Sequence, residues 1–132
     1  KHPDFKLAIN NLAALLIDSN TEQDVIKGFA LAEKIKDSEN PYLLDTYAWG
    51  LVKTGKVSEG LKILETLIVN EPKMPEIRYH LGMAHFENGN KATAIIELKQ
   101  ALSLADKQKR DFSGKENAMK VLKSLDTLPT QK

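Results

Sequence analysis

Three histidines are the side chains of this 132-residue sequence best suited to bind a metal ion or to transfer protons near neutral pH. His80 and His85 are separated by roughly 140° around an α-helix, so their rings diverge, whereas those of an i, i+4 pair meet. No His-Glu-x-x-His motif is present, and His2 stands alone near the N-terminus. We therefore expect no metal site and interpret the histidines as structural or exposed.

The other residue patterns that carry enzyme chemistry are also missing. Cysteine is absent, no serine lies in a Gly-x-Ser-x-Gly motif, and the glycines form neither a phosphate-binding loop nor a dinucleotide-binding fingerprint. The sequence predicts a protein that is not an enzyme, with no catalytic residues and no cofactor.

Charge and hydropathy narrow the classes of partner. The 19 Lys and Arg nearly balance the 18 Asp and Glu, and they do not gather on one helix face, so we expect no nucleic acid partner. No apolar run approaches the roughly 18 residues of a spanning helix, so no direct membrane insertion is expected. The chain begins with Lys1 and not with Met, from which we expect a piece of a longer protein.

One pattern is written twice between Pro41 and Ala105, at an offset of 75 − 41 = 34 residues. In each copy a proline opens the first helix, where its missing N–H costs little, and Asn40 is placed to cap the first of these helices. Gly55 and Gly89 mark the turns between the two helices of each copy. Small residues stand at four matching positions where helices can cross closely: Ala48 and Gly82 in the first helices, Gly60 and Ala94 in the second.

A looser copy precedes this repeat, and a single helix follows it. Helices are predicted over 5–17 and 24–35, and the apolar coverage of the first predicts burial on more than one side. The later second helices are predicted over 57–69 and 91–105, followed by a break at Asp106–Arg110. Ser113 and Glu116 form a capping-box pattern that opens a last helix. We expect one domain over 1–126, with units at 5–37, 41–74 and 75–108, a capping helix at 114–126 and a frayed tail at 127–132.

The repeated positions resemble those of the tetratricopeptide repeat (TPR) family, whose unit is a 34-residue helix–turn–helix. The matching residues of the last full unit are Leu81, Gly82, Ala94, Leu98 and Ala101, while His85 and Asp106 depart from the aromatic residue and the proline of the pattern. The resemblance implies an all-α fold, a right-handed TPR superhelix of about three helix–turn–helix units plus a C-terminal capping helix.

The resemblance also implies a concave groove lined by the first helix of each unit. Carried over by position, the candidate groove residues are Asn10, Tyr42, Asp45, Trp49, Lys53, Glu76, Tyr79, Met83 and Phe86. Grouped aromatic side chains are typical of recognition surfaces. The alternative is that several of them pack between neighbouring first helices. The Lys and Asn clamp with which some TPR domains hold a chaperone's C-terminal carboxylate is missing, so that ligand is not expected.

A narrower resemblance concerns the order of short sequence motifs along the chain. NNLAALL, Asp45–Trp49, Pro75–Gly82 and a short last helix follow one another as in the C-terminal TPR block of bacterial proteins associated with exopolysaccharide export and exosortase sorting, some of them lipoproteins. This resemblance implies a periplasmic or outer-membrane-tethered position. A cytoplasmic position is the alternative.

Two functions remain in competition. The first is a protein–protein interaction module that holds a peptide or helix of a partner protein in its groove. The second is a structural role, either as the terminal segment of a long TPR scaffold or in homo-oligomerisation through the apolar first helix, Phe5 to Ile17.

Overall fold

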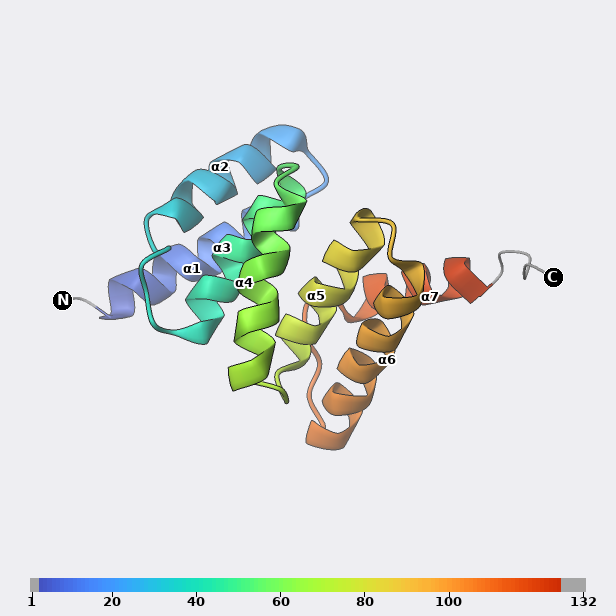
Figure 1. The fold of residues 1–132 in the computed structure, drawn as a ribbon. Helices are drawn as coiled ribbons and strands as arrows, with labels where there is room; N and C mark the ends of the chain where they lie inside the picture. Colours follow the sequence, from blue (N-terminus) through green and yellow to red (C-terminus); the bar gives the residue numbers. More distant parts are fainter. Residues whose placement is uncertain (1–2, 127–132) are drawn as a thin grey trace. The chain divides into compact units, whose positions relative to one another are not determined.

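The computed structural model describes residues 3–126, and this part of the chain is built from helices without any strand. The all-α class is thereby confirmed. The helices are α1 (Pro3–Ile17), α2 (Glu22–Glu33), α3 (Pro41–Lys53), α4 (Val57–Asn70), α5 (Pro75–Glu87), α6 (Lys91–Gln108) and α7 (Lys115–Asp126), as Figure 1 shows. The predicted frayed tail at 127–132 lies outside the described residues.

Two helix boundaries differ from the predicted ones for identifiable reasons. Helix α6 continues through Asp106, Lys107 and Gln108, and it ends only where Lys109 adopts a left-handed backbone conformation with φ 56°. Charged residues do not break a helix by themselves, so the predicted break comes too early. Helix α7 begins at Lys115, and the carbonyl of Gly114 accepts a hydrogen bond from the Ala118 amide, so Gly114 takes the place we predicted for Ser113.

The chain divides into two compact units, Lys1–Leu67 and Ile68–Lys132, with the boundary inside the last turn of α4. In the first unit α1, α2 and α3 contact one another. In the second unit α6 packs against both α5 and α7. The prediction of one domain over 1–126 stays a prediction.

Aliphatic side chains form the core of the first unit. The largest fully buried ones are Ile17, Ile35, Leu43, Leu51 and Leu64. Helix α1 contributes only one side to this core, because four of its large apolar residues are exposed: Phe5 (66%), Leu7 (43%), Leu12 (49%) and Leu15 (71%). The prediction that α1 is buried on more than one side is therefore wrong for the chain as described. Its apolar coverage exceeds what α2 and α3 can cover.

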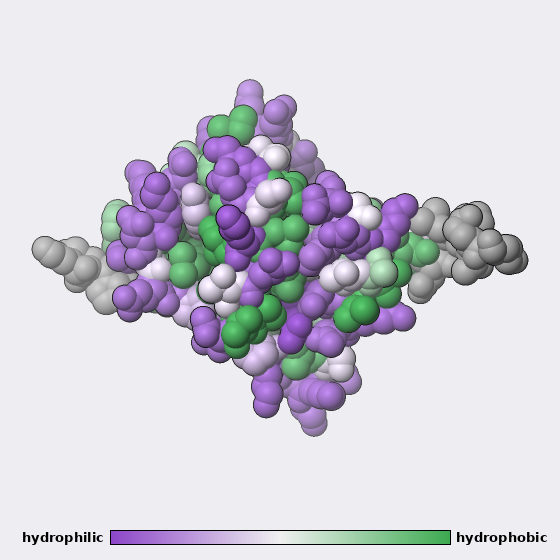
Figure 2. All heavy atoms as spheres, in the orientation of Figure 1, coloured by the Kyte–Doolittle hydropathy of each residue, from purple (hydrophilic) through white to green (hydrophobic). Residues whose placement is uncertain are grey.

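The second unit has its own core. Ile77 and Leu98 are fully buried, and Phe112 and Leu122 are nearly so. Leu122 belongs to α7, whose exposed side carries charged residues while Ala118 is completely buried. Figure 2 shows that hydrophilic residues prevail on the face in view, with hydrophobic patches between them.

The α3–α4 and α5–α6 turns are built alike. Gly55 and Gly89 both have positive φ, 95° and 85°, which an L-residue with a side chain adopts only at a cost. The amide after each glycine donates to the carbonyl five residues earlier: Lys56 to Leu51 and Asn90 to His85, both at 2.8 Å. This is the Schellman arrangement that ends many helices. The sequence prediction that these two glycines stop the first helices is confirmed.

The first of these hairpins also has the predicted N-cap. The side chain of Asn40 accepts a hydrogen bond from the Tyr42 amide at 2.9 Å, directly before Pro41 opens α3. Helix α5 opens with Pro75 in the same way, but Met74 precedes it and gives no side-chain cap. The two helices therefore share the proline and differ in the cap.

Close helix crossings occur where small residues were noted. A Cβ on Gly60 of α4 would lie 2.7 Å from the Ala48 carbonyl oxygen of α3, and one on Gly82 of α5 would lie 2.9 Å from the Leu98 side chain of α6. In the first hairpin, a Cβ on Gly28 would lie 2.9 Å from the Ala13 carbonyl oxygen. Each of the three helix pairs thus has a point where only glycine fits without a shift.

Candidate functional site

The predicted groove residues of α3 divide into exposed and buried ones. Tyr42 is 45% exposed and the Lys53 side chain is also exposed, whereas Asp45 and Trp49 retain only 4% each. The Trp49 indole N–H donates to the carboxylate of Asp18 at 2.8 Å. Asp18 belongs to the turn that connects α1 to α2. The Lys53 ammonium lies 5.5 Å from the centre of the Trp49 ring, within the range of a cation–π contact. Trp49 is therefore fixed inside the first unit.

Asn10 is the one candidate groove residue that lies on α1. Its side chain is partly buried, and its Oδ1 is buried without a hydrogen-bond partner among the described residues. A buried acceptor without a donor costs free energy.

In the second unit the groove residue Glu76 forms an ion pair with Arg110, which follows α6. The guanidinium donates two hydrogen bonds to the two carboxylate oxygens, at 2.8 and 3.0 Å. Burial of Glu76 opposes its ionisation, but the hydrogen bonds and the charge of Arg110 outweigh it and lower the pKa of Glu76. A lowered pKa in the folded state means that the pair stabilises the fold above pH 4.5, the ordinary pKa, and that this contribution is lost as the pH falls through the lowered pKa.

Tyr79 and Met83 of α5 are held by residues of the C-terminal part of the chain. Asn117 of α7 donates to the Tyr79 hydroxyl at 2.8 Å, and its nitrogen lies 3.8 Å from the Met83 sulfur. The ring of Phe112 lies 5.6 Å from that of Tyr79, and a Cβ on Gly114 would come within 2.5 Å of the Tyr79 ring. Tyr79 is 5% exposed and Met83 7%, so little of either side chain is available to a partner.

Phe86 completes the predicted set and is partly buried near the end of α5. The structure thus gives the candidate groove residues two kinds of surroundings. Side chains with accessible area are Tyr42, Lys53 and in part Asn10, Glu76 and Phe86, while Asp45, Trp49, Tyr79 and Met83 are buried. Their role in binding a partner stays a prediction.

Sequence reasoning missed the residues that fix these aromatic side chains. Asp18, Phe112, Gly114 and Asn117 come from loops or from α7, and none belongs to a repeated position. The one indication in the sequence is Gly114 itself, because a glycine can mark a place where other atoms approach the backbone closely.

The two histidines within residues 3–126, His80 and His85, do not form a shared site. His80 is 8% exposed and its ring lies 5.2 Å from that of Tyr79, whereas His85 pairs with Asn90 at the α5–α6 turn, with 3.2 Å between Nδ1 and the Asn90 amide nitrogen. Within the described residues no group of three or more His, Asp or Glu side chains could hold a metal ion. None of the described helices is both long enough and apolar enough to cross a membrane.

The class that the fold defines is an all-α protein made of successive helix hairpins. In comparisons with known proteins, no family model matches the chain and no curated protein matches it.

Proposed function

We propose that this chain is a TPR-type repeat protein whose hairpins α1/α2, α3/α4 and α5/α6 stack as a right-handed superhelix capped by α7, and that it binds a segment of a partner protein. The observation that carries the proposal is the repetition at a 34-residue offset. Pro41 and Pro75 open helices, Gly55 and Gly89 take positive φ, and the same amide-to-carbonyl bond closes both turns. A repeat of local geometry at this period is typical of helix–turn–helix solenoids.

The contact face that we propose is the accessible part of the predicted groove. Tyr42 and Lys53 on α3 combine a large amphipathic ring with a cation, and Trp49 beneath Lys53 holds the ammonium in place. Asn10 on α1 adds a partly accessible amide side chain. Such a set suits a peptide segment better than a small molecule, because its members belong to separate helices.

The test is quantitative affinity capture from an extract of the cells that contain the protein. The wild type is compared with Tyr42→Ala/Lys53→Ala and with the matched control Ile26→Ala/Lys99→Ala, whose residues are also exposed. Variants of Trp49 and Tyr79 are avoided, because these side chains are bonded internally and their loss would disturb folding. We expect a partner whose recovery falls about tenfold with the first variant and not with the control. Equal recovery with both variants would refute the proposed face.

One observation favours the structural alternative. The exposed residues Phe5, Leu12 and Leu15 recur along α1 at i, i+7 and i+10, and so form an apolar stripe on one side of it. A second copy or another repeat could cover that stripe. Sedimentation velocity tests this alternative: a wild type that dimerises and a Leu12→Glu/Leu15→Glu variant that stays monomeric would support it, and a wild type that is monomeric at high concentration would exclude self-association.

The position in the cell belongs to the same proposal. The order of sequence phrases supports a bacterial envelope protein connected with exopolysaccharide export, periplasmic or tethered to the outer membrane. Fractionation of the native cells tests it, and recovery in the cytosol would refute it.

A further inference from the structure

A second surface of the first unit has the features of a binding site that the groove prediction does not include. A hollow of about 430 Å³ lies between α3, α4 and the residues that follow α2. Leu44, Tyr47, Ile63 and Leu67 supply its apolar lining, and Thr66 adds a hydroxyl. The volume falls within the range of ordinary ligand pockets, roughly 300–1,000 Å³.

The hollow lies on the other side of α3 from the proposed groove residues. Leu44 precedes Trp49 by five residues, and Tyr47 precedes it by two, which places both roughly 140–160° away from Trp49 around the helix. The ring of Tyr47 stacks on Phe29 of α2, with 5.9 Å between the centroids and 11° between the planes. One wall of the hollow is therefore held in place by α2.

The turn that follows α2 borders the hollow. Helix α2 has 12 residues, whereas the corresponding second helices α4 and α6 have 14 and 18. After Glu33 the chain turns, and the amides of Lys34, Ile35 and Ser38 each donate to the carbonyl three residues earlier. The turn puts Lys36 at the rim of the hollow.

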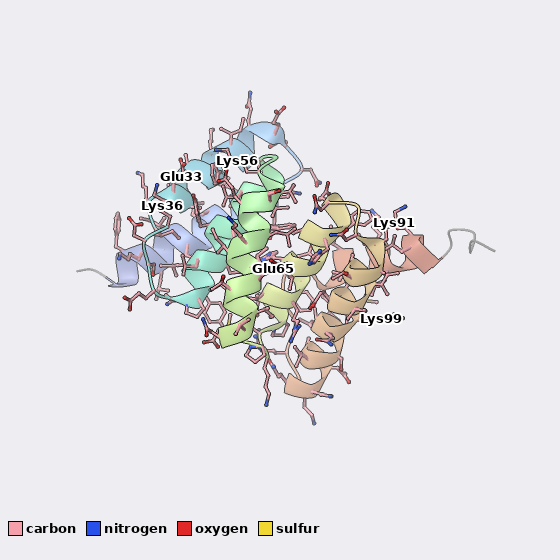
Figure 3. The ribbon with its side chains drawn as sticks, in the orientation of Figure 1. Glu33, Lys36, Lys56, Glu65, Lys91 and Lys99 are labelled. Atoms are coloured by element: carbon pink, nitrogen blue, oxygen red, sulfur yellow. The ribbon has the colours of Figure 1, made fainter. Side chains whose placement is uncertain are left out.

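The rim carries positive charge. Lys36 and Lys62 both line the hollow, and no Asp or Glu is among its lining residues in the described part of the chain. Two acidic residues are near in sequence but do not line the hollow: Glu33 is the last residue of α2, and Glu65 lies on α4, three residues after Lys62. Glu65 interacts with another residue of the chain. Figure 3 labels Lys36 after α2 and Glu65 on α4, and Figure 2 shows hydrophobic atoms among hydrophilic ones over α4.

We propose that this hollow binds an acidic peptide segment with one or two aliphatic side chains. The aliphatic side chains would fill the space between Leu44, Ile63 and Leu67, where burial of apolar surface supplies the affinity. Carboxylates on either side of them would pair with Lys36 and Lys62, which steers the encounter and selects acidic over basic sequences. The site is separate from the proposed groove and does not depend on it.

The proposal is tested with two synthetic, fluorescently labelled peptides, EELLEE and its basic counterpart KKLLKK, titrated against the whole chain by fluorescence polarisation. We expect the acidic peptide to bind and the basic one not to bind. Lys36→Glu/Lys62→Glu should weaken the acidic peptide at least about tenfold and allow the basic peptide to bind. The matched control is Lys91→Glu/Lys99→Glu on α6, two exposed lysines labelled in Figure 3, which should change neither affinity.

A third variant tests the apolar part. Ile63→Ser leaves the charges in place and should also weaken the acidic peptide, while circular dichroism verifies that its helix content is unchanged. Three results would overturn the proposal: equal binding of the two peptides, equal effects of the rim and control variants, or rim-dependent binding to anionic lipid vesicles but not to peptide. Tyr42→Ala should leave acidic-peptide binding unchanged, so failure of this site and failure of the groove can be told apart.

Discussion

The α3/α4 hairpin and the α5/α6 hairpin have the same turn but exchange their small residues. In both turns a glycine has positive φ and the following amide donates over 2.8 Å to the carbonyl five residues back. At the crossing, Gly60 of the second helix lies against Ala48 of the first. In the copy 34 residues later the glycine is Gly82 of the first helix, which lies against Leu98, and Ala94 stands at the position that corresponds to Gly60. The glycine thus stands in the second helix of one hairpin and in the first helix of the other, and the two helices approach closely in both.

The difference follows from two distinct structural requirements. A turn with positive φ strains one particular residue, so the glycine must stand at that residue in each copy. A close crossing requires free space between two helices, and that space is available when a residue of either helix lacks a side chain. The repeated pattern is strict at Gly55 and Gly89 for the first reason and variable at the crossing for the second.

The largest effect that the two hairpins should share comes from their central leucines. Leu64 and Leu98 occupy equivalent positions 34 residues apart and both are completely buried. Leu64→Ala and Leu98→Ala should each lower the free energy of unfolding by about 2–5 kcal/mol, because a cavity replaces the side chain. Urea unfolding measures the loss.

Hydrogen exchange shows where that loss falls. Leu64→Ala should lower amide protection mainly in the first unit and Leu98→Ala mainly in the second. A loss spread evenly over the chain from either variant would contradict the description of two units. Val69→Ala, a change at a 77% exposed position on α4, serves as the control and should cost little.

The exchanged glycines should differ in how much an added methyl group costs. In Gly60→Ala the new Cβ would lie 2.7 Å from the Ala48 carbonyl oxygen, a backbone atom, so the helices must move apart. In Gly82→Ala it would lie 2.9 Å from Cγ and Cδ2 of Leu98 and 3.2 Å from the Leu98 backbone nitrogen, so the nearest backbone atom is farther away than in Gly60→Ala. After the helix-propensity gain of alanine, about 2 kcal/mol is expected for Gly60→Ala and about 1 for Gly82→Ala.

The measurement is again urea unfolding, with Ser58→Ala on α4 as a control for a surface change in the same helix. A cost for Gly82→Ala that equals or exceeds that for Gly60→Ala would show that the Leu98 side chain is as unyielding as a backbone carbonyl. The explanation of the exchange by free space would then be wrong.

Local features of the hairpins could be predicted from the sequence because they depend on short stretches of it. The all-α class, the prolines that open α3 and α5, the Asn40 cap and the turn glycines all follow from residues within a few positions of each other. The end of α6 could not be predicted, because Lys109 has no intrinsic preference for the left-handed conformation it adopts.

The surroundings of the candidate site could not be predicted for a different reason. Trp49 bonds to Asp18 across 31 residues and Tyr79 to Asn117 across 38, so neither contact has a trace in the local pattern. The positions carried over from the TPR resemblance pointed to side chains of α1, α3 and α5, but not to which of them other parts of the chain would cover. The apolar hollow beside Tyr47 was also missed, since its lining residues come from α3, α4 and the turn after α2 and meet only in the folded chain.

The two turn glycines should respond identically, in contrast with the crossing glycines. A Cβ added at Gly55 or at Gly89 would meet no other atom within 4 Å, so only the strain of positive φ opposes a side chain. Gly55→Ala and Gly89→Ala should each cost about 1 kcal/mol, the left-handed penalty less the gain from a stiffer unfolded chain. Thermal unfolding measures both, and a difference of more than about 0.5 kcal/mol would mean that the turns are not equivalent.

The smallest expected effect extends the comparison to a third helix end. Lys109 has φ 56°, and the Arg110 amide after it donates to the carbonyl of Ala105, five residues back, at 3.1 Å. This is the arrangement of Gly55 and Gly89 with a lysine in the glycine's place. Lys109→Gly should therefore raise the free energy of unfolding by up to about 1 kcal/mol, whereas Lys107→Gly, inside α6, should lower it by a similar amount. If both variants destabilised the chain equally, the strain at Lys109 would be relieved by contacts of its side chain, and the third turn would differ from the first two.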